Sequence, residues 1–332
     1  RESTSVIVSC DAQSRVTVLN FRANGMSGTI DPGVYLLSDL ETFAFSDAAI
    51  GGTISTYINH LSSLTSLSLV KLDMDGAVPS EIGLMSNLKE LEILDTAITG
   101  PLPTEIGNCG NLTSLYIQRT EITGQIPSEI GNLAALEHLF LGSNELTGQI
   151  PSELGLLTSL TDLWLDDNNL IGSMPPELGR AVKLDTMSLG GNALTGRIPT
   201  TIGNLTALEW LSLAANGGIT GSIPTEIGLM TELSHLSLNS VRLTGTVPSE
   251  MGNLVQLQAF YMSSGSQNGS YPIELTNLKN LTTFWVIWNG ITGDLDPILC
   301  NPPNRSNNFA ADCLDRGSRI PKVTCTCCSI CF

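Results

Sequence analysis

Apolar residues alternate with other residues over short stretches of this chain, and these stretches return at a fixed interval. Leu139 and Leu141 flank Phe140, and Leu163 and Leu165 flank Trp164 in the same way 24 residues later. Alternation with a period of two residues predicts a short strand that is buried on one side. The residue between each pair of leucines is therefore expected to point away from the core.

A glycine within a GxIP-like element shows how far this repeat extends. Its occurrences are 24 residues apart, with a single step of 25 residues between Gly196 and Gly221. The glycines are Gly28, Gly52, Gly76, Gly100, Gly124, Gly148, Gly172, Gly196, Gly221, Gly245, Gly269 and Gly293. An internal period between 20 and 50 residues indicates a solenoid. We therefore predict one array of about twelve coils, although the length alone suggests about two domains.

A second element follows the strand in each copy. In the stretch LTGxIP, glycine permits a tight backbone path and proline excludes a central position in a strand ladder. The residues after the proline, such as Ser128 with Glu129 and Ser152 with Glu153, predict a short helical turn. We expect the serine to cap this turn and the glutamate to lie in its first residues.

These motifs resemble the leucine-rich repeat family. ITGQIPSEIGNL at residues 122–133 and LTGQIPSELGLL at residues 146–157 look like its plant-type extracellular subclass. The fold expected is α/β: a right-handed solenoid of about twelve 24-residue coils, with a parallel sheet on the concave face and short 3-10 or α turns on the convex face. The predicted domains are an N-terminal cap remnant at residues 1–15, the solenoid at 16–297 and a cysteine-rich C-terminal cap at 298–332.

The resemblance also implies that an asparagine after the strand closes a ladder of hydrogen bonds between coils. This slot holds Asn24, Asn144, Asn168, Asn192, Asn216 and Asn289. In the other copies it holds Ala48, Leu72, Thr96, Thr120, Val241 and Gly265. We therefore expect the most regular coils near the centre of the array, and we expect the extra residue at Gly217 or Gly218 to loop out without shifting the core.

Cysteines gather at the C-terminal end. Six of the eight cysteines lie in the last 33 residues, namely Cys300, Cys313, Cys325, Cys327, Cys328 and Cys331. We predict three disulfides among them, with Cys300–Cys313 as the first pairing and with Cys327 and Cys328 bonded to different partners. A metal site on the last four is the alternative, but their spacing is not that of paired CxxC zinc ligands. Cys109 replaces a core leucine and is expected to be a buried free thiol, and Cys10 to be unpaired.

The composition, and the absence of catalytic and metal-binding motifs, exclude several classes of function. A net charge of −17 argues against a general affinity for nucleic acid or for an anionic membrane surface. No apolar run is long enough to span a membrane. His60, His138 and His235 lack metal-ligand spacing, and no nucleophile or phosphate-binding motif occurs, so we expect neither an enzyme, nor a metal, nor a cofactor.

Disulfides suggest an extracellular protein or the ectodomain of a surface protein. Five glycosylation sequons permit secretion, in a number close to chance; they begin at Asn111, Asn204, Asn268, Asn280 and Asn304. A row of glutamates that includes Glu105 and Glu129 occupies one slot per coil, which we interpret as compensation of the helical turns' dipoles.

The outward strand position offers the clearest functional signal. From the N-terminus it holds Asn20, Ala44, Ser68, Glu92, Tyr116, Phe140, Trp164, Ser188, Ser212, Ser237, Tyr261 and Trp285. Three neighbouring aromatics stand in one row, although only 5% of the chain is aromatic. An exposed aromatic patch marks a contact surface, which would be rimmed by Arg119, His138, Asp166, Asp167 and Trp210. The alternative is that the rings only pack along the sheet and stiffen it.

We therefore predict a recognition protein whose concave face, around Tyr116, Phe140 and Trp164, docks a peptide, protein or glycan. Receptor ectodomains and secreted binders are common among proteins with plant-type repeats, and the resemblance implies the same here. Two other functions are kept: a structural component of a matrix, wall or assembly, which could self-associate, and an inhibitor of secreted wall-degrading enzymes.

Overall fold

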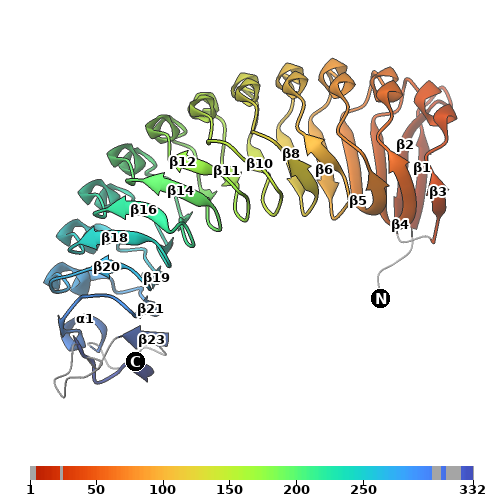
Figure 1. Ribbon diagram of the computed structural model, residues 1–332. Coiled ribbons are helices and arrows are strands. Elements are labelled where there is room, and N and C mark those ends of the chain that lie inside the picture. The colour runs from red at the N-terminus through yellow and green to blue at the C-terminus, as the bar shows by residue number, and fades with distance from the viewer. Residues whose placement is uncertain (1–4, 23–24, 301–307, 312–322, 332) are drawn as a thin grey trace. The chain divides into compact units, whose positions relative to one another are not determined.

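The alternating leucines lie in strands of parallel sheets in a computed structural model, which describes residues 5–22, 25–300, 308–311 and 323–331. The chain divides into two units, Arg1–Asn169 and Leu170–Phe332, and each is described by itself. Within each unit, strands line one side of the coils and 3-10 helices line the other (Figure 1). This arrangement confirms the predicted solenoid.

The sheet of the first unit runs from an antiparallel pair, β1 and β2, into parallel strands. Its strands are β1 (Ser5–Cys10), β2 (Val16–Arg22), β4 (Thr42–Thr53), β5 (Ser66–Asp75), β6 (Glu90–Leu94), β8 (Ser114–Gln118), β10 (His138–Phe140) and β11 (Asp162–Trp164). Outside this path, β3 (Ser27–Thr29) pairs with β4, and β7 (Thr99–Pro101) pairs with β9 (Glu121–Thr123). The 3-10 helices are η1 (Pro32–Leu36), η2 (Thr56–His60), η3 (Ser80–Leu84), η4 (Thr104–Asn108), η5 (Ser128–Asn132) and η6 (Ser152–Leu156).

The second unit repeats this plan. Its main sheet contains β13 (Thr186–Ser188), β15 (Trp210–Ser212), β17 (His235–Ser237), β19 (Ala259–Tyr261), β21 (Thr283–Val286), β23 (Asn308–Ala311) and β25 (Ile330–Cys331). A narrower sheet contains β12 (Ile171–Ser173), β14 (Ala193–Gly196), β16 (Gly218–Gly221), β18 (Arg242–Gly245) and β20 (Ser266–Gln267), and β22 (Gly293–Asp294) pairs with β24 (Val323–Thr324). The helices are η7 (Pro176–Arg180), η8 (Thr200–Asn204), η9 (Thr225–Leu229), η10 (Ser249–Asn253), η11 (Ile273–Asn277) and α1 (Asp296–Leu299).

The predicted serine caps are wrong. Pro127 is the N-cap residue of η5, with extended backbone angles, and no side chain caps the helix. Ser128 is already the first helical residue, so its hydroxyl donates instead to the carboxylate of Glu129 at 3.3 Å. Where Ser55 takes the place of this proline, before η2, its hydroxyl does accept from the backbone N–H of Tyr57 at 3.2 Å. The glutamate does lie in the first turn, as predicted.

Glycines let successive 3-10 helices stack closely. Gly107 in η4 is buried, and a Cβ added to it would lie 2.8 Å from the carbonyl carbon of Glu129 and closer still to its oxygen. Gly83, Gly131, Gly203, Gly228 and Gly252 meet the backbone of the next coil in the same way. The last 3-10 helix, η11, has Thr276 in this slot and is followed by α1.

The asparagine ladder is present in the described coils. Asn144 donates from Nδ2 to the carbonyl oxygens of Ile117 and Leu141, at 2.8 and 3.0 Å. Its Oδ1 accepts from the backbone N–H and the hydroxyl of Thr120, at 3.1 and 2.6 Å. Equivalent bonds are made by Asn168, Asn192, Asn216 and Asn289, whereas Asn24 lies outside the described residues.

Two coils that lack the asparagine fold differently. Ala48 and Leu72 have no amide with which to bind the backbone at the bend, and there β4 and β5 stay paired past the slot, from Thr42↔Ser66 to Thr53↔Asp75. The coils with Thr96, Thr120 and Val241 in the slot keep short strands, so regular coils extend beyond those that carry the asparagine. In the 25-residue coil, Asn216 keeps its place in the ladder and Ile219 stays buried, so the exposed Gly217 absorbs the extra residue.

A left-handed backbone residue precedes the asparagine slot in each coil from β4 to β21. These residues have φ between 50° and 62°, and they are Asp47, Lys71, Asp95, Arg119, Ser143, Asp167, Gly191, Ala215, Ser240, Ser264 and Trp288. Residues with a side chain rarely adopt this conformation, which costs roughly 1–2 kcal/mol each. The geometry of the coil therefore fixes this conformation whatever the side chain.

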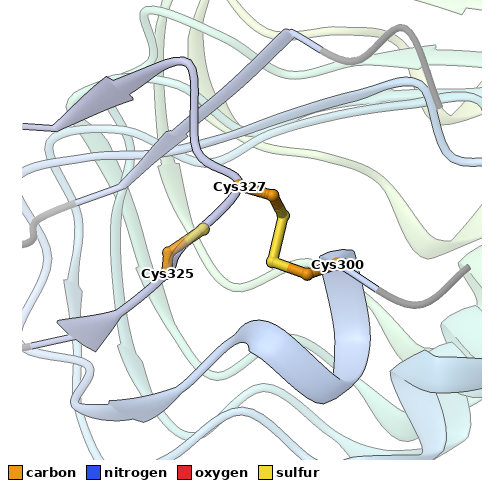
Figure 2. A group of neighbouring side chains, drawn as sticks. All are labelled: Cys300, Cys325 and Cys327. Carbon is orange, nitrogen blue, oxygen red and sulfur yellow. A yellow bond between two sulfur atoms is a disulfide. The ribbon is translucent and has the colours of Figure 1, made fainter. Parts of the chain in front are cut away.

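The C-terminal disulfides differ from the first predicted pairing. Cys300 bonds to Cys327, not to Cys313, because β22 pairs with β24 and brings residues 325–328 against the end of α1. Figure 2 shows this bond, with Cys325 beside it. Cys325 bonds to Cys328, so the adjacent Cys327 and Cys328 do have different partners. Cys313 and the side chain of Cys331 lie outside the described residues, and the third disulfide stays a prediction.

Cys109 and Cys10 are free, as expected. Cys109 is fully buried and donates weakly to the carbonyl oxygen of Ile82 at 3.2 Å, and burial raises the pKa of its thiol to about 11. Cys10, at the end of β1, is exposed.

One coil of the second unit carries an amide in its core. Gln267 occupies the slot that holds Leu243 and Ile219 in earlier coils, and it is fully buried. Neither Nε2 nor Oε1 has a hydrogen-bond partner. Its Oε1 lies where a Cβ at Gly265 would stand, so the amide fills the space of the asparagine that this coil lacks.

Replacing Gln267 with leucine is therefore expected to raise the free energy of unfolding by about 1–2 kcal/mol, because a buried unsatisfied amide costs roughly 1–3 kcal/mol. Gly265→Asn alone should be destabilising, since its side chain would meet the Gln267 amide. Combined with Gln267→Leu it should become stabilising, which denaturant titration of the single and double variants would detect. Additive effects of the two substitutions would contradict this account of the coil.

Candidate functional site

Tyr116, Phe140 and Trp164 form an aromatic row across three strands of the first unit. They stand opposite one another in the register of β8, β10 and β11. The flanking leucines, such as Leu139 and Leu141, are fully buried, so the three rings lie on the opposite, solvent face of the sheet. Each ring is partly exposed.

The rings of the aromatic row pack against one another. Tyr116 and Phe140 are stacked, with centroids 4.9 Å apart and planes inclined by 16°. Trp164 meets Phe140 edge to face, at 5.5 Å and 77°. Packing along the sheet, the alternative considered from the sequence, is thus present, and the rings nevertheless remain open to solvent. Such a row is both preorganised and accessible.

His138 extends the row toward the start of the strand. Its ring is nearly parallel to that of Phe140, at 2° and 6.4 Å between centroids, and it also stacks on Tyr116. Its Nδ1 lies 2.7 Å from Oδ2 of Asp162. Our sequence analysis missed Asp162, although the 24-residue spacing places it directly opposite His138 in the next strand.

Arg119 lies at the left-handed position beside the row, and its charge is already engaged. Its Nε and one terminal nitrogen donate to the two carboxylate oxygens of Asp95, at 2.6 and 3.0 Å. These hydrogen bonds hold the pKa of Asp95 below its ordinary value and raise that of Arg119. Two coils earlier, Lys71 forms a similar ion pair, with its Nζ 3.3 Å from Oδ1 of Asp47.

Glu90 and Glu92 stand beside Tyr116, and neither was among the predicted site residues. Glu92 is opposite Tyr116 in the register of β6 and β8, and Glu90 is opposite Ser114. Burial raises the pKa of Tyr116, and the negative charges of Glu90, Asp162 and Glu92 raise it further. Glu92 is in the row of outward positions read from the sequence, and Glu90 is two residues before it on the same face, so extending that reading by one outward position would have found Glu90.

The acidic pair Asp166 and Asp167 lies at the end of β11, as predicted. Asp166 is partly exposed, and its Oδ1 would be 2.9 Å from a Cβ on Gly142 in the preceding coil. Asp167 is exposed. The last predicted rim residue, Trp210, belongs to the second unit, where it is 39% exposed and stacks on His235 at 4.6 Å. The first unit therefore brings together seven of the eight predicted residues.

Glycosylation candidates lie away from the aromatic row. Asn111, Asn204, Asn268 and Asn280 are exposed, and none lies in a strand of a main sheet. The amides of Asn111 and Asn280 donate to the carbonyl oxygens of Ser86 and Val255. Asn304 is outside the described residues.

In the described part of the chain, side chains of the types that bind metals come close together at one place. The sulfurs of Cys300, Cys325 and Cys327 lie within 4.8 Å of one another, but each is held in a disulfide and is no thiolate donor in this state. Among the described residues, no helix has the length and apolarity required to cross a membrane.

Comparison with known proteins identifies the repeat. The leucine-rich repeat family model matches residues 110–170. Among solved structures, a plant peptide hormone receptor, RGFR1 in complex with RGF2, is 27% identical with a TM-score of 0.76, and the match covers 96% of this chain and 56% of that one. The Arabidopsis receptor kinase HAESA, in complex with the peptide hormone IDA and the co-receptor SERK1, is 31% identical with a TM-score of 0.80, covering 86% and 48%.

An internalin from Listeria monocytogenes shares the fold at 21% identity and a TM-score of 0.64, covering 90% of this chain and 87% of that one. No curated protein sequence matches the chain. The chain spans about half the length of the plant receptors that it matches.

Proposed function

The chain is a leucine-rich repeat protein of the plant type, and from this premise we propose that it is an extracellular recognition protein that binds a peptide across its aromatic row. The proposal rests mainly on the aromatic row itself, in which three partly exposed rings lie in register on one face of the sheet. Rings fixed by mutual stacking offer a large apolar contact and lose little conformational entropy on binding. Their spacing along neighbouring strands suits an extended ligand that crosses the coils.

Two further observations support the proposal. The plant structures that resemble this chain are described as receptors in complex with peptide hormones. The disulfides of the C-terminal segment are of the kind that persists in an oxidising, extracellular compartment.

Replacing Tyr116, Phe140 and Trp164 together with alanine is expected to weaken binding by about 100-fold or more, because buried aromatic anchors carry most of the affinity of such interfaces. Ligands would come from selection of a random-peptide phage library on the wild-type protein, and their affinity would be measured by calorimetry. Tyr57→Ala is the control, since Tyr57 is a 58% exposed aromatic on the 3-10 helix side. Circular dichroism would check the fold of both variants.

Other outcomes decide against peptide recognition on this face. Unchanged affinity in a folded triple variant would remove the aromatic row from the account. Failure to select any peptide, together with self-association in size-exclusion chromatography, would favour the structural role. Inhibition of a secreted wall-degrading enzyme, or binding of an oligosaccharide that depends on the three rings, would favour the inhibitor or a glycan-binding function.

A further inference from the structure

The aromatic row ends at Tyr116 on the side of β6. Tyr116 stacks on Phe140 with nearly parallel planes, so one of its faces is covered from the side of β10. Strands β6, β8 and β10 follow one another in the sheet (Figure 1), and the other face of the Tyr116 ring is therefore directed toward β6. The residue of β6 opposite Tyr116 is Glu92.

The glutamates of β6 lean away from this ring. The Ser68 hydroxyl donates to Glu92 Oε2 at 2.6 Å, and the Ser66 hydroxyl donates to Glu90 Oε2 at 2.9 Å. Both serines belong to β5, on the far side of β6 from Tyr116. The surface over β6 is therefore flanked by the Tyr116 ring on the β8 side and by the carboxylates of Glu90 and Glu92, held toward β5, on the other. We call this the β6 slot.

The carboxylates of the β6 slot have no ion-pair partner among the described residues. Each accepts from a neutral hydroxyl instead. Among the basic side chains nearby, Arg119 pairs with Asp95 and Lys71 pairs with Asp47, and Arg22 lines a pocket with Glu92 without forming an ion pair to it. The raised pKa of Tyr116 has contributions from the same glutamates, which shows that their field reaches the ring.

Carboxylates that have no ion pair and lie beside an aromatic ring attract a cation. Both features favour arginine over lysine, because a planar guanidinium stacks on a ring and donates two parallel hydrogen bonds to a carboxylate. We infer that the β6 slot binds an arginine side chain of the peptide that lies on the aromatic row. This inference rests on the proposed function and adds the ligand's chemistry to it.

The test uses the same random-peptide library, selected on the full chain. Wild type is expected to enrich arginine-containing peptides. For a selected peptide, the variant Glu90→Gln with Glu92→Gln should bind about tenfold or more weakly, and replacing the peptide's arginine with neutral, isosteric citrulline should cost as much. Replacing the arginine with lysine should recover only part of the loss. Binding should also weaken as salt rises, since the slot is partly exposed.

A matched control separates the slot from net charge. Glu105→Gln with Glu129→Gln removes the same charge from the 3-10 helix side of neighbouring coils and should leave affinity unchanged. The glutamines in the slot can keep the serine hydrogen bonds, so thermal unfolding of the slot variant should match that of wild type.

The outcomes distinguish this inference from the proposed function. The inference would be overturned, and the proposed function would stand, if the selected peptides contained no arginine. The same holds if their affinity were unchanged by Glu90→Gln with Glu92→Gln but lowered in the aromatic triple variant. Peptides that bind the aromatic triple variant as tightly as wild type would overturn both the inference and the proposed function. An equal loss in the two double variants would show a general charge effect and would also overturn the slot.

Discussion

Gly107→Ala is expected to lower the free energy of unfolding by about 3 kcal/mol, at the upper end of the cost of overpacking a core. The added Cβ would stand 2.8 Å from the carbonyl carbon of Glu129 in the next coil. Backbone cannot rotate away as a flexible side chain can, so η4 and η5 would have to separate. Because each coil contacts only its neighbours, the strain should stay local and appear as a lower denaturant midpoint.

Gly110→Ala is the matched control for this effect. Gly110 lies three residues further along the same coil, and a Cβ there would have no neighbouring atom within 4 Å. This substitution should therefore change stability by less than about 0.5 kcal/mol, as is usual for surface positions. Similar midpoints for the two alanine variants would refute the view that the glycine slot sets the spacing of the coils.

Asn144→Ala is expected to cost about 3–4 kcal/mol, because one side chain satisfies backbone groups of two coils. Its loss would leave the carbonyl oxygens of Ile117 and Leu141 and the N–H of Thr120 without this partner. Each buried group left unsatisfied costs roughly 1–3 kcal/mol, and partial rearrangement should reduce the sum. The effect would be measured by chemical denaturation, with hydrogen exchange at Thr120 as a local readout.

Asn132→Ala tests whether asparagine itself matters to the coil. Asn132 ends η5 and is exposed, so its replacement should be close to neutral. Unaltered exchange at Thr120 in Asn144→Ala would argue that the ladder is a consequence of the fold and not a support for it.

The repeat made much of the fold predictable. Leucine alternation located strands such as β10 and β11, because a period of two residues can bury only one face of a strand. The serine caps failed for a local reason: a proline one residue earlier takes the capping position. The Cys300–Cys313 pairing failed for a long-range reason, since the pairing of β22 with β24 depends on how the last segment folds back.

The candidate site likewise has a part that could be predicted from the sequence and a part that could not. The aromatic row is a one-dimensional feature, with one residue per period, and the sequence revealed it directly. The partners Asp162, Asp95 and Glu90 are two-dimensional, since each requires both the strand alternation and the 24-residue step to be followed at once. How Glu90 and Glu92 lean depends on serines one coil earlier, and only the structure shows that direction.

The left-handed position beside each strand has a consequence for how this surface can diversify. Its backbone conformation is set by the coil, and Asp47, Lys71, Ser143, Ala215 and Trp288 all adopt it. The charge or size of the side chain can therefore change there while the coil is kept. Each repeat therefore has one position at the rim of the sheet where the side chain can be substituted without changing the backbone. Natural variation or directed evolution can change the binding specificity there while the scaffold stays the same.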